Sequence, residues 1–204
     1  MITIVDYGLG NIRAFVNIYK KLGVACSIAR DADSLSRASR LILPGVGAFD
    51  RAMQQLEDSG LRPILDDLVL NQQVPVLGIC VGMHMMANRS DEGHLPGLGW
   101  IPGEVKLFDE GLLSSKIRLP HMGWNDLAPK AHPLFANISD PRFYFLHSYY
   151  FLPVSAEQIL AEADYGQRFA AAVRREQLIG VQFHPEKSHH WGTQLLKNFA
   201  EHQF

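Results

Sequence analysis

Apolar and polar residues alternate in two different patterns along the first half of the chain. Short apolar runs, several rich in β-branched residues, predict strands at 2–7, 25–30, 40–45 and 74–80. Between them, apolar residues recur at the spacing of a helix face, which predicts helices at 12–22, 49–60, 63–70 and 82–89. Strands that alternate with helices predict an α/β fold with a mainly parallel sheet.

The second half has shorter apolar runs with more aromatic residues. These runs predict strands at 104–108, 116–125, 142–151, 168–175 and 178–186. We expect them to extend the sheet in an antiparallel or mixed manner, and we expect a closing helix at 194–202. Because no repeat or linker-like stretch interrupts the sequence, we expect one domain over residues 1–204.

Composition narrows the classes of function. The chain carries 19 Lys and Arg against 21 Asp and Glu, without a basic stripe, so we expect no nucleic-acid partner. No apolar run approaches the roughly 20 residues of a membrane span, and the start lacks the features of a signal peptide. Two cysteines, Cys26 and Cys80, are too few for a disulfide framework. We therefore expect a protein of the reducing cytoplasm, with no membrane contact.

Cys80 lies where a predicted strand turns into a predicted helix, in the sequence Gly78-Ile-Cys-Val-Gly82. Glycines allow a tight strand-to-helix turn, and the same turn exposes the residue at its corner, as in the G-x-S-x-G nucleophile elbow. The following helix N-terminus favours a thiolate, and the Val81 N–H can serve as an oxyanion donor. The alternative is a buried structural cysteine at a glycine-rich strand end.

A nucleophilic thiol needs a base, and the stretch GVQFHPEKS offers one in His184. In an extended segment, residues two apart point the same way, so Glu186 is predicted to orient the His184 ring. The alternative is a surface His-Pro turn with a solvated glutamate. A further glycine-rich corner, Pro44-Gly-Val-Gly47, can present a backbone N–H to an oxyanion, or can be a plain strand-to-helix turn.

The motifs LPGVGAF, GICVGM, PHMGWN, FLHSY and GVQFHPEKS occur in this order. Together they resemble the class I glutamine amidotransferases with a Cys-His-Glu triad, most closely the glutaminase subunit of imidazole glycerol phosphate synthase, the HisH family. The resemblance covers essentially the whole chain. It implies a flavodoxin-like α/β fold with a mixed, mainly parallel central sheet and helices on both faces, and it implies no cofactor and no metal.

The resemblance also implies a reaction. The Cys80 thiolate attacks the carboxamide of L-glutamine, while the N–H groups of Val81 and Gly47 hold the oxyanion. His184, oriented by Glu186, protonates the leaving ammonia, and water hydrolyses the glutamyl thioester. The ammonia passes to a (β/α)₈-barrel cyclase, the partner in a heterodimer, which makes imidazole glycerol phosphate and AICAR in histidine biosynthesis.

Further roles follow from the same resemblance. The FLHSY stretch implies that His147, Ser148 and Tyr149 line the glutamine pocket, and Tyr144 is implied at the partner interface. Ordinary sheet packing is the alternative for the two tyrosines.

Three more residues are implied at the interface: Asn11, Trp124 and Lys187. A core aromatic is the alternative for Trp124, and a solvated side chain is the alternative for Lys187. The PGVG stretch is linked in the family to activation, in which ligand in the partner's site lets a peptide turn its N–H toward the oxyanion.

His84 departs from the family pattern, which has a substrate-binding glutamine at this position. A histidine offers one hydrogen bond where an amide offers a paired donor and acceptor. We expect His84 to line the pocket, and the alternative is a helix histidine that faces away.

Other functions are weighed against this one. A metal hydrolase would use ligands from among Cys80, His184, Glu186, His189 and His190, but their spacing differs from a helical HExxH pair. We expect His189 and His190 to be a solvated pair near the interface. A non-catalytic binding subunit would not need the complete triad. A paralogous glutaminase subunit, which feeds ammonia to a sugar-aminating enzyme of surface polysaccharide synthesis, would have the same triad, and the departure at His84 favours this alternative.

Overall fold

A computed structural model of the chain describes residues 1–109, 111 and 118–202. Eleven strands in this part of the chain form one sheet, in the order β2-β1-β3-β4-β13-β12-β10-β6-β5, with β11 and β8 continuing from β12. Their bounds are β1 Ile2–Val5, β2 Cys26–Ala29, β3 Leu41–Gly45, β4 Val76–Cys80, β5 Arg89–Ser90, β6 Gly103–Leu107, β8 Ala128–Pro129, β10 Tyr149–Pro153, β11 Ile159–Asp164, β12 Arg168–Arg175 and β13 Leu178–Val181.

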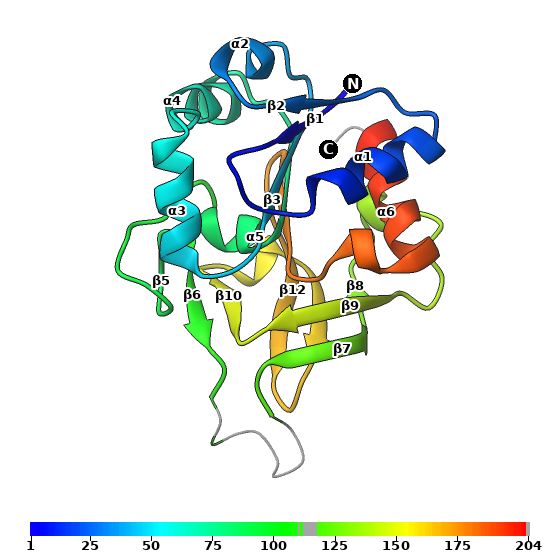
Figure 1. Cartoon of the computed structure of the whole chain (residues 1–204). Helices are drawn as coiled ribbons and strands as arrows, with labels where there is room; N and C mark the ends of the chain where they lie inside the picture. Colours follow the sequence, from blue (N-terminus) through cyan, green and yellow to red (C-terminus); the bar gives the residue numbers. More distant parts are fainter. Residues whose placement is uncertain (110, 112–117, 203–204) are drawn as a thin grey trace.

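The predicted parallel part of the sheet is present. β1 pairs in parallel with β2 and β3, β3 pairs with β4, and β4 pairs with β13. Figure 1 shows α1 (Ile12–Lys21) and α6 (His189–Glu201) on one side of these strands, and α3 (Phe49–Asp58) and α5 (Val81–Met85) on the other. Because both faces are covered, β1, β3, β4 and β13 are buried throughout, which explains their continuous apolar runs. The predicted α/β fold is confirmed.

The carboxyl ends of β1, β3, β4 and β13 meet at one edge of the sheet, because these strands are parallel. In such sheets this edge carries the functional loops. The sequences DYGLGN, PGVG, GICVG and FHPE all follow or end these strands, so the fold gathers the motifs that the sequence singled out.

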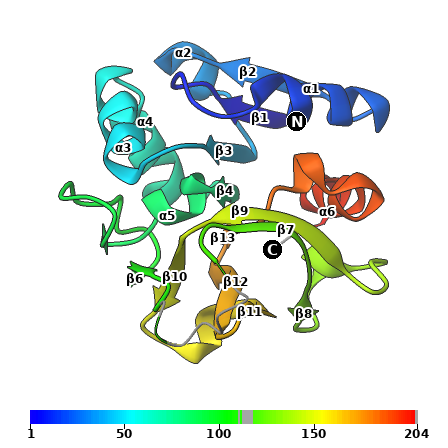
Figure 2. The ribbon, with the colours of Figure 1, turned by 60° about the horizontal axis from the view of Figure 1, so that its bottom comes forward.

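The expected antiparallel extension of the sheet is present, because β12 pairs antiparallel with β13, and β10 pairs antiparallel with β12 and β6. One part of the second half departs from it. β9 (Arg142–His147) pairs with β7 (His121–Asp126) in a separate two-stranded sheet, and Figure 1 and Figure 2 show the two strands side by side. A single strand over 142–151 is therefore wrong, because Ser148 separates β9 from β10. Of the strand expected at 116–125, residues 116 and 117 lie outside the described residues.

The helix expected at 82–89 is also wrong beyond Met85, where α5 ends. The backbone N–H groups of residues 97–99 and 101 bond to the carbonyls of residues 85–88, so these carbonyls are not available for further helical bonds. The chain then continues into the short strand β5. A long-range loop contact, rather than any local signal, ends the helix.

The remaining helices agree with the expectation in kind and differ at their ends. α4 (Arg62–Asp66) continues as a π-helical turn, Asp67–Asn71, and α6 begins at His189 rather than at residue 194. A short helix α2 (Ala32–Leu35) precedes β3.

The strand β11 was not predicted, because its sequence ILAEAD consists mostly of good helix formers. Its pairing with β12 overrides their helix propensity. Within the described residues, no helix has both the length and the apolar character that a membrane crossing requires.

Candidate active site

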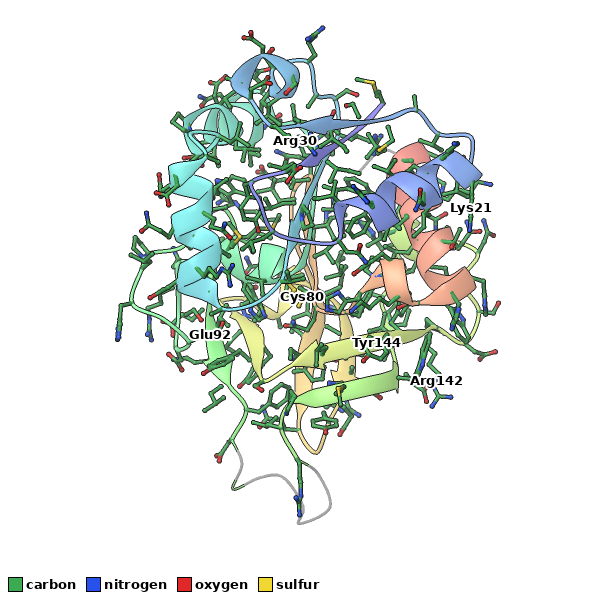
Figure 3. The ribbon with its side chains drawn as sticks, viewed as in Figure 1. Lys21, Arg30, Cys80, Glu92, Arg142 and Tyr144 are labelled. Atoms are coloured by element: carbon green, nitrogen blue, oxygen red, sulfur yellow. The ribbon has the colours of Figure 1, made fainter. Side chains whose placement is uncertain are left out.

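Cys80 ends β4 at the point where the chain turns into α5. Its φ of 54° and ψ of −112° are strained for a residue with a side chain. A Cβ on Gly82 would lie 2.0 Å from the Leu43 carbonyl oxygen, and a Cβ on Gly45 would lie 2.3 Å from the Gly82 nitrogen. Glycine at both positions therefore allows β3 and α5 to approach closely, and the turn between them presents the thiol at the carboxyl edge of the sheet. In Figure 3, Cys80 lies near the centre of the molecule.

His184 and Glu186 follow β13, the strand next to β4. The Nδ1 atom of His184 lies 3.0 Å from Oε1 of Glu186, and both side chains are almost completely buried. The backbone N–H of His184 donates to the Tyr144 carbonyl oxygen at 2.9 Å, which fixes the histidine between two strands. The expected contact is present, but the extended geometry proposed for it is wrong. Residues Pro185–Lys187 form a 3₁₀ turn, and this turn brings the carboxylate back to the ring.

The charge of His184 is set by its two partners. Burial alone lowers the pKa of His184, but hydrogen bonds with Cys80 and Glu186 outweigh burial and raise this pKa to about 10. At neutral pH the ring is therefore an imidazolium beside the Cys80 sulfur. This pKa lies above the unfolded value of about 6.5. The contacts of the charged His184 ring therefore stabilise the folded state fully below pH 6.5, and this contribution is lost as the pH rises through about 10.

Replacing Glu186 with glutamine should slow the reaction of Cys80 with iodoacetamide at neutral pH. The loss of the carboxylate removes one of the partners that raise the pKa of His184, so the ring is less often an imidazolium beside the sulfur at pH 7. We expect a rate about tenfold lower at pH 7, and no difference above about pH 9.5, where cysteines ionise without help. The measurement is alkylation against pH in a Cys26→Ser background. Glu157→Gln, at an exposed surface turn, is the control, and an unchanged profile for Glu186→Gln would contradict the assigned role.

Cys80 and His184 open into a cavity of about 330 Å³, a size typical of small-molecule sites. The structure brings most of the predicted pocket residues to its wall together with several others. The lining residues are Val46, Gly47, Cys80, Val81, His84, Glu92, Pro120, Leu146, His147, Ser148, Tyr149, His184 and Lys187.

The PGVG stretch is anchored at one end and open at the other. The buried Tyr7 hydroxyl donates to the Pro44 carbonyl oxygen at 2.7 Å, and a Cβ on Gly10 would lie 2.7 Å from the Pro44 side chain. At the other end, Gly47 has a φ of 89°, and a Cβ there would meet nothing within 4 Å among the described residues. Gly47 therefore has both the space and the backbone freedom to reorient a peptide beside the cavity.

His84 lies in the cavity wall. Its Nε2 is 2.7 Å from Oε1 of the fully buried Gln182. Burial lowers the pKa of His84 to about 4, so the ring is neutral and Nε2 is the donor. Its buried Nδ1 makes no hydrogen bond within the described part of the chain, and this nitrogen is therefore a free acceptor.

Glu92 also lines the cavity, and sequence reasoning missed it. Its carboxylate accepts the Phe49 N–H at 3.0 Å, at the start of α3. The Asp50 carboxylate binds the backbone N–H groups of His94 and Leu95 and so holds the loop that carries Glu92. Burial raises the pKa of Glu92. No local pattern marks this residue, because the loop reaches the site through contacts with α3.

Three of the residues expected at a partner interface lie outside the cavity wall: Asn11, Trp124 and Tyr144. Trp124 is 37% exposed, so it is not a core aromatic, and it stacks on His189 with ring centroids 5.1 Å apart. Lys187 lines the cavity and places its Nζ 5.7 Å from the centre of the Tyr144 ring. Asn11 is exposed just before α1.

No group of three or more His, Cys, Asp or Glu side chains in the described ranges has the geometry to hold a metal ion. His189 and His190 are exposed, as expected, but each lies against an aromatic ring: His189 stacks on Trp124, and His190 lies tilted against Trp191.

The sheet order, the strained cysteine and the adjoining His-Glu pair agree with a class I glutamine amidotransferase. The chain matches the family described as "Glutamine amidotransferase class-I" over residues 3–203, and it belongs to that family. A solved structure described as a glutamine amidotransferase has a TM-score of 0.76 with this chain at 20% identity, covering 98% of this chain and 97% of the other. At that identity the likeness supports the fold.

Two relatives are much more similar in sequence. Imidazole glycerol phosphate synthase subunit HisH of Bdellovibrio bacteriovorus is 56% identical over 98% of this chain and 100% of its own. The subunit of the same name from Leptospira interrogans is 46% identical over 98% of this chain and 99% of its own. Within the class, the chain belongs to the HisH family.

Proposed function

We propose that this chain hydrolyses L-glutamine as the glutaminase subunit of an imidazole glycerol phosphate synthase. The observation that carries the proposal is the Cys80–His184–Glu186 cluster, which opens into a cavity of about 330 Å³. The Cys80 thiolate attacks the carboxamide carbon, and His184 gives its proton to the leaving ammonia. Water, deprotonated by His184, then hydrolyses the thioester, which releases glutamate and restores the thiolate.

The oxyanion of this reaction needs backbone donors. The N–H of Val81, the first residue of α5, follows the nucleophile directly. The second donor is the N–H of Gly47. Its open surroundings and positive φ allow this peptide to turn its N–H toward the cavity, and the trigger is ligand binding in the partner's site. This arrangement predicts a slow enzyme until the partner's site is filled.

The cavity wall supplies groups that suit free glutamine. The Glu92 carboxylate complements an α-ammonium group, and the His84 ring lines the same cavity. His147, Ser148 and Tyr149 also line the cavity. Together they would hold the substrate with its carboxamide toward Cys80.

Ammonia must remain neutral and protected from solvent to act as a nucleophile, so we propose that it passes directly to a (β/α)₈-barrel cyclase in the cytoplasm. The cyclase would dock on the outer face of β7 and β9. This face carries exposed apolar side chains, because Met122, Trp124 and Leu146 are 65%, 37% and 38% exposed. Leu146 also lines the cavity, so this surface borders the site at which ammonia forms.

The proposal is tested by glutamine hydrolysis with and without the cyclase subunit of the same organism. We expect slow hydrolysis by the chain alone and a stimulation of about 10- to 100-fold when cyclase and its ribonucleotide ligand are both present. Full activity of the chain alone would contradict the gating. Stimulation by a sugar-aminating synthase, and none by the cyclase, would replace the proposed partner.

A further inference from the structure

Two buried histidines, His121 and the cavity-lining His147, form a hydrogen bond that takes no part in the proposed chemical steps. His121 Nδ1 lies 2.9 Å from His147 Nε2. On one side, His147 Nδ1 lies 2.9 Å from the Tyr149 carbonyl oxygen, and on the other, Asn125 Nδ2 lies 3.3 Å from His121 Nε2. The four residues form a continuous chain of hydrogen bonds from β7 to β10.

The direction of every bond in this chain is determined. The carbonyl oxygen of Tyr149 only accepts, so His147 carries its proton on Nδ1 and presents a lone pair at Nε2. His121 must then donate from Nδ1, which leaves its own Nε2 to accept from the Asn125 amide. The amide is fixed as well, because its nitrogen also donates to the Asp164 carbonyl oxygen at 2.8 Å.

The surroundings keep both rings neutral. His121 lies between Phe145 and Tyr165, with ring centroids 4.8 Å and 3.9 Å away, and His147 lies 5.1 Å from the Phe169 ring. Burial lowers the pKa of His121 to about 4, and burial followed by the neighbouring histidine lowers the pKa of His147 well below its ordinary value. Each ring therefore offers one donor and one acceptor at neutral pH, as the chain of bonds requires.

The chain of bonds ends on a corner of the backbone that forms one wall of the cavity. His147 ends β9, Tyr149 begins β10, and Ser148 is the corner between them. The bond from the His147 ring to the Tyr149 carbonyl spans this corner. Immediately before it, the Leu146 carbonyl oxygen lies 4.0 Å from Cys80 Sγ. The His147 ring thus fixes the wall that faces the nucleophile.

We propose that His121 is a positioning residue for glutamine binding: its donation to His147 Nε2 holds that ring where it fixes the Ser148 corner. The proposal rests on the proposed glutaminase function, and it gives a role to the PHMGWN motif that the triad does not explain. His121 acts through His147 and not on the substrate itself.

Two substitutions separate this hydrogen bond from simple packing. His121→Asn places an amide nitrogen where Nδ1 was, so it retains the donor and loses the ring. His121→Phe retains a ring between Phe145 and Tyr165 and loses the donor. A positioning role predicts that His121→Asn binds a glutamine analogue more tightly than His121→Phe does. A packing role predicts the reverse order.

The readout is inactivation of the full-length chain by acivicin, an electrophilic glutamine analogue, with Cys26→Ser as the common background. We expect KI to rise about tenfold in His121→Phe and about twofold in His121→Asn, with the limiting rate of inactivation unchanged. Alkylation by iodoacetamide, which is too small to need the pocket, should proceed at the wild-type rate in both variants. Equal KI values for the two variants, or a lower KI for Phe, would overturn the proposal.

A second measurement needs no variant and decides the matter if a His121 variant fails to fold. Nitrogen NMR of the histidine rings at neutral pH should show His121 and His147 both neutral and both protonated at Nδ1. An imidazolium or an Nε2–H form of either ring would overturn the proposal. If acivicin does not label Cys80 in the unsubstituted chain, the glutaminase function itself fails, which is a different outcome from an unchanged KI.

Discussion

Replacing Cys80 with serine should reduce glutamine hydrolysis at least about a thousandfold, even with the cyclase and its ligand present. The serine hydroxyl is close in size to the thiol and leaves the strained turn between β4 and α5 intact. It is far less acidic than a thiol, however, so His184 cannot hold it as an anion at neutral pH. The loss should therefore appear in kcat, measured by glutamate release.

Cys26→Ser is the matched control for this experiment. Cys26 lies in β2, at the opposite edge of the parallel strands from β13, and burial raises the pKa of its thiol. We expect glutamine hydrolysis in Cys26→Ser to remain within about twofold of the wild type, because surface-proximal substitutions away from a site have small effects. If Cys80→Ser retained activity or Cys26→Ser lost it, the nucleophile would be assigned to the wrong cysteine.

The parallel half of the fold could be predicted because its signals are local. A strand buried on both faces must be apolar throughout, and β3 and β4 are recognisable for that reason alone. Once these strands are parallel, their carboxyl ends meet at one edge of the sheet. The proximity of the glycine-rich corners at Gly47 and Cys80 therefore follows from the parallel pairing alone.

The contact between His184 and Glu186 was predicted for the wrong reason. An extended segment would have placed the two side chains on one face of a strand, but Pro185 starts a 3₁₀ turn instead. The hydrogen bond forms because a short turn brings residues two apart into contact as effectively as a strand does. Spacing in the sequence therefore indicated the pair but not its geometry.

Residues that reach the site through long-range contacts were not predictable from local patterns. Glu92 is placed by bonds to Phe49 and by the loop that Asp50 holds, and these partners are more than 40 residues away. The bond between His121 and His147 likewise depends on the pairing of β7 with β9. Single-sequence reasoning detects apolar periodicity, and it has no access to such pairings.

Replacing Gly82 with alanine should lower the free energy of unfolding by about 3 kcal/mol or more and abolish glutamine hydrolysis. The new Cβ would lie 2.0 Å from the Leu43 carbonyl oxygen, a backbone atom that cannot move aside alone. Either α5 moves away from β3 or the turn at Cys80 opens. Both changes displace the thiol from His184, so activity should be lost even in the fraction of molecules that folds.

Gly60→Ala is the matched control, because the same methyl group is added where a Cβ meets nothing within 4 Å in the described part of the chain. Gly60 has a φ of 69°, so the substitution should cost about 1 kcal/mol of backbone strain and leave activity unchanged. Denaturant unfolding followed by fluorescence gives both free energies, and glutamate release gives the activities. A Gly82→Ala variant as stable and as active as Gly60→Ala would show that β3 and α5 do not need their close approach, and that the elbow tolerates a looser turn than its geometry indicates.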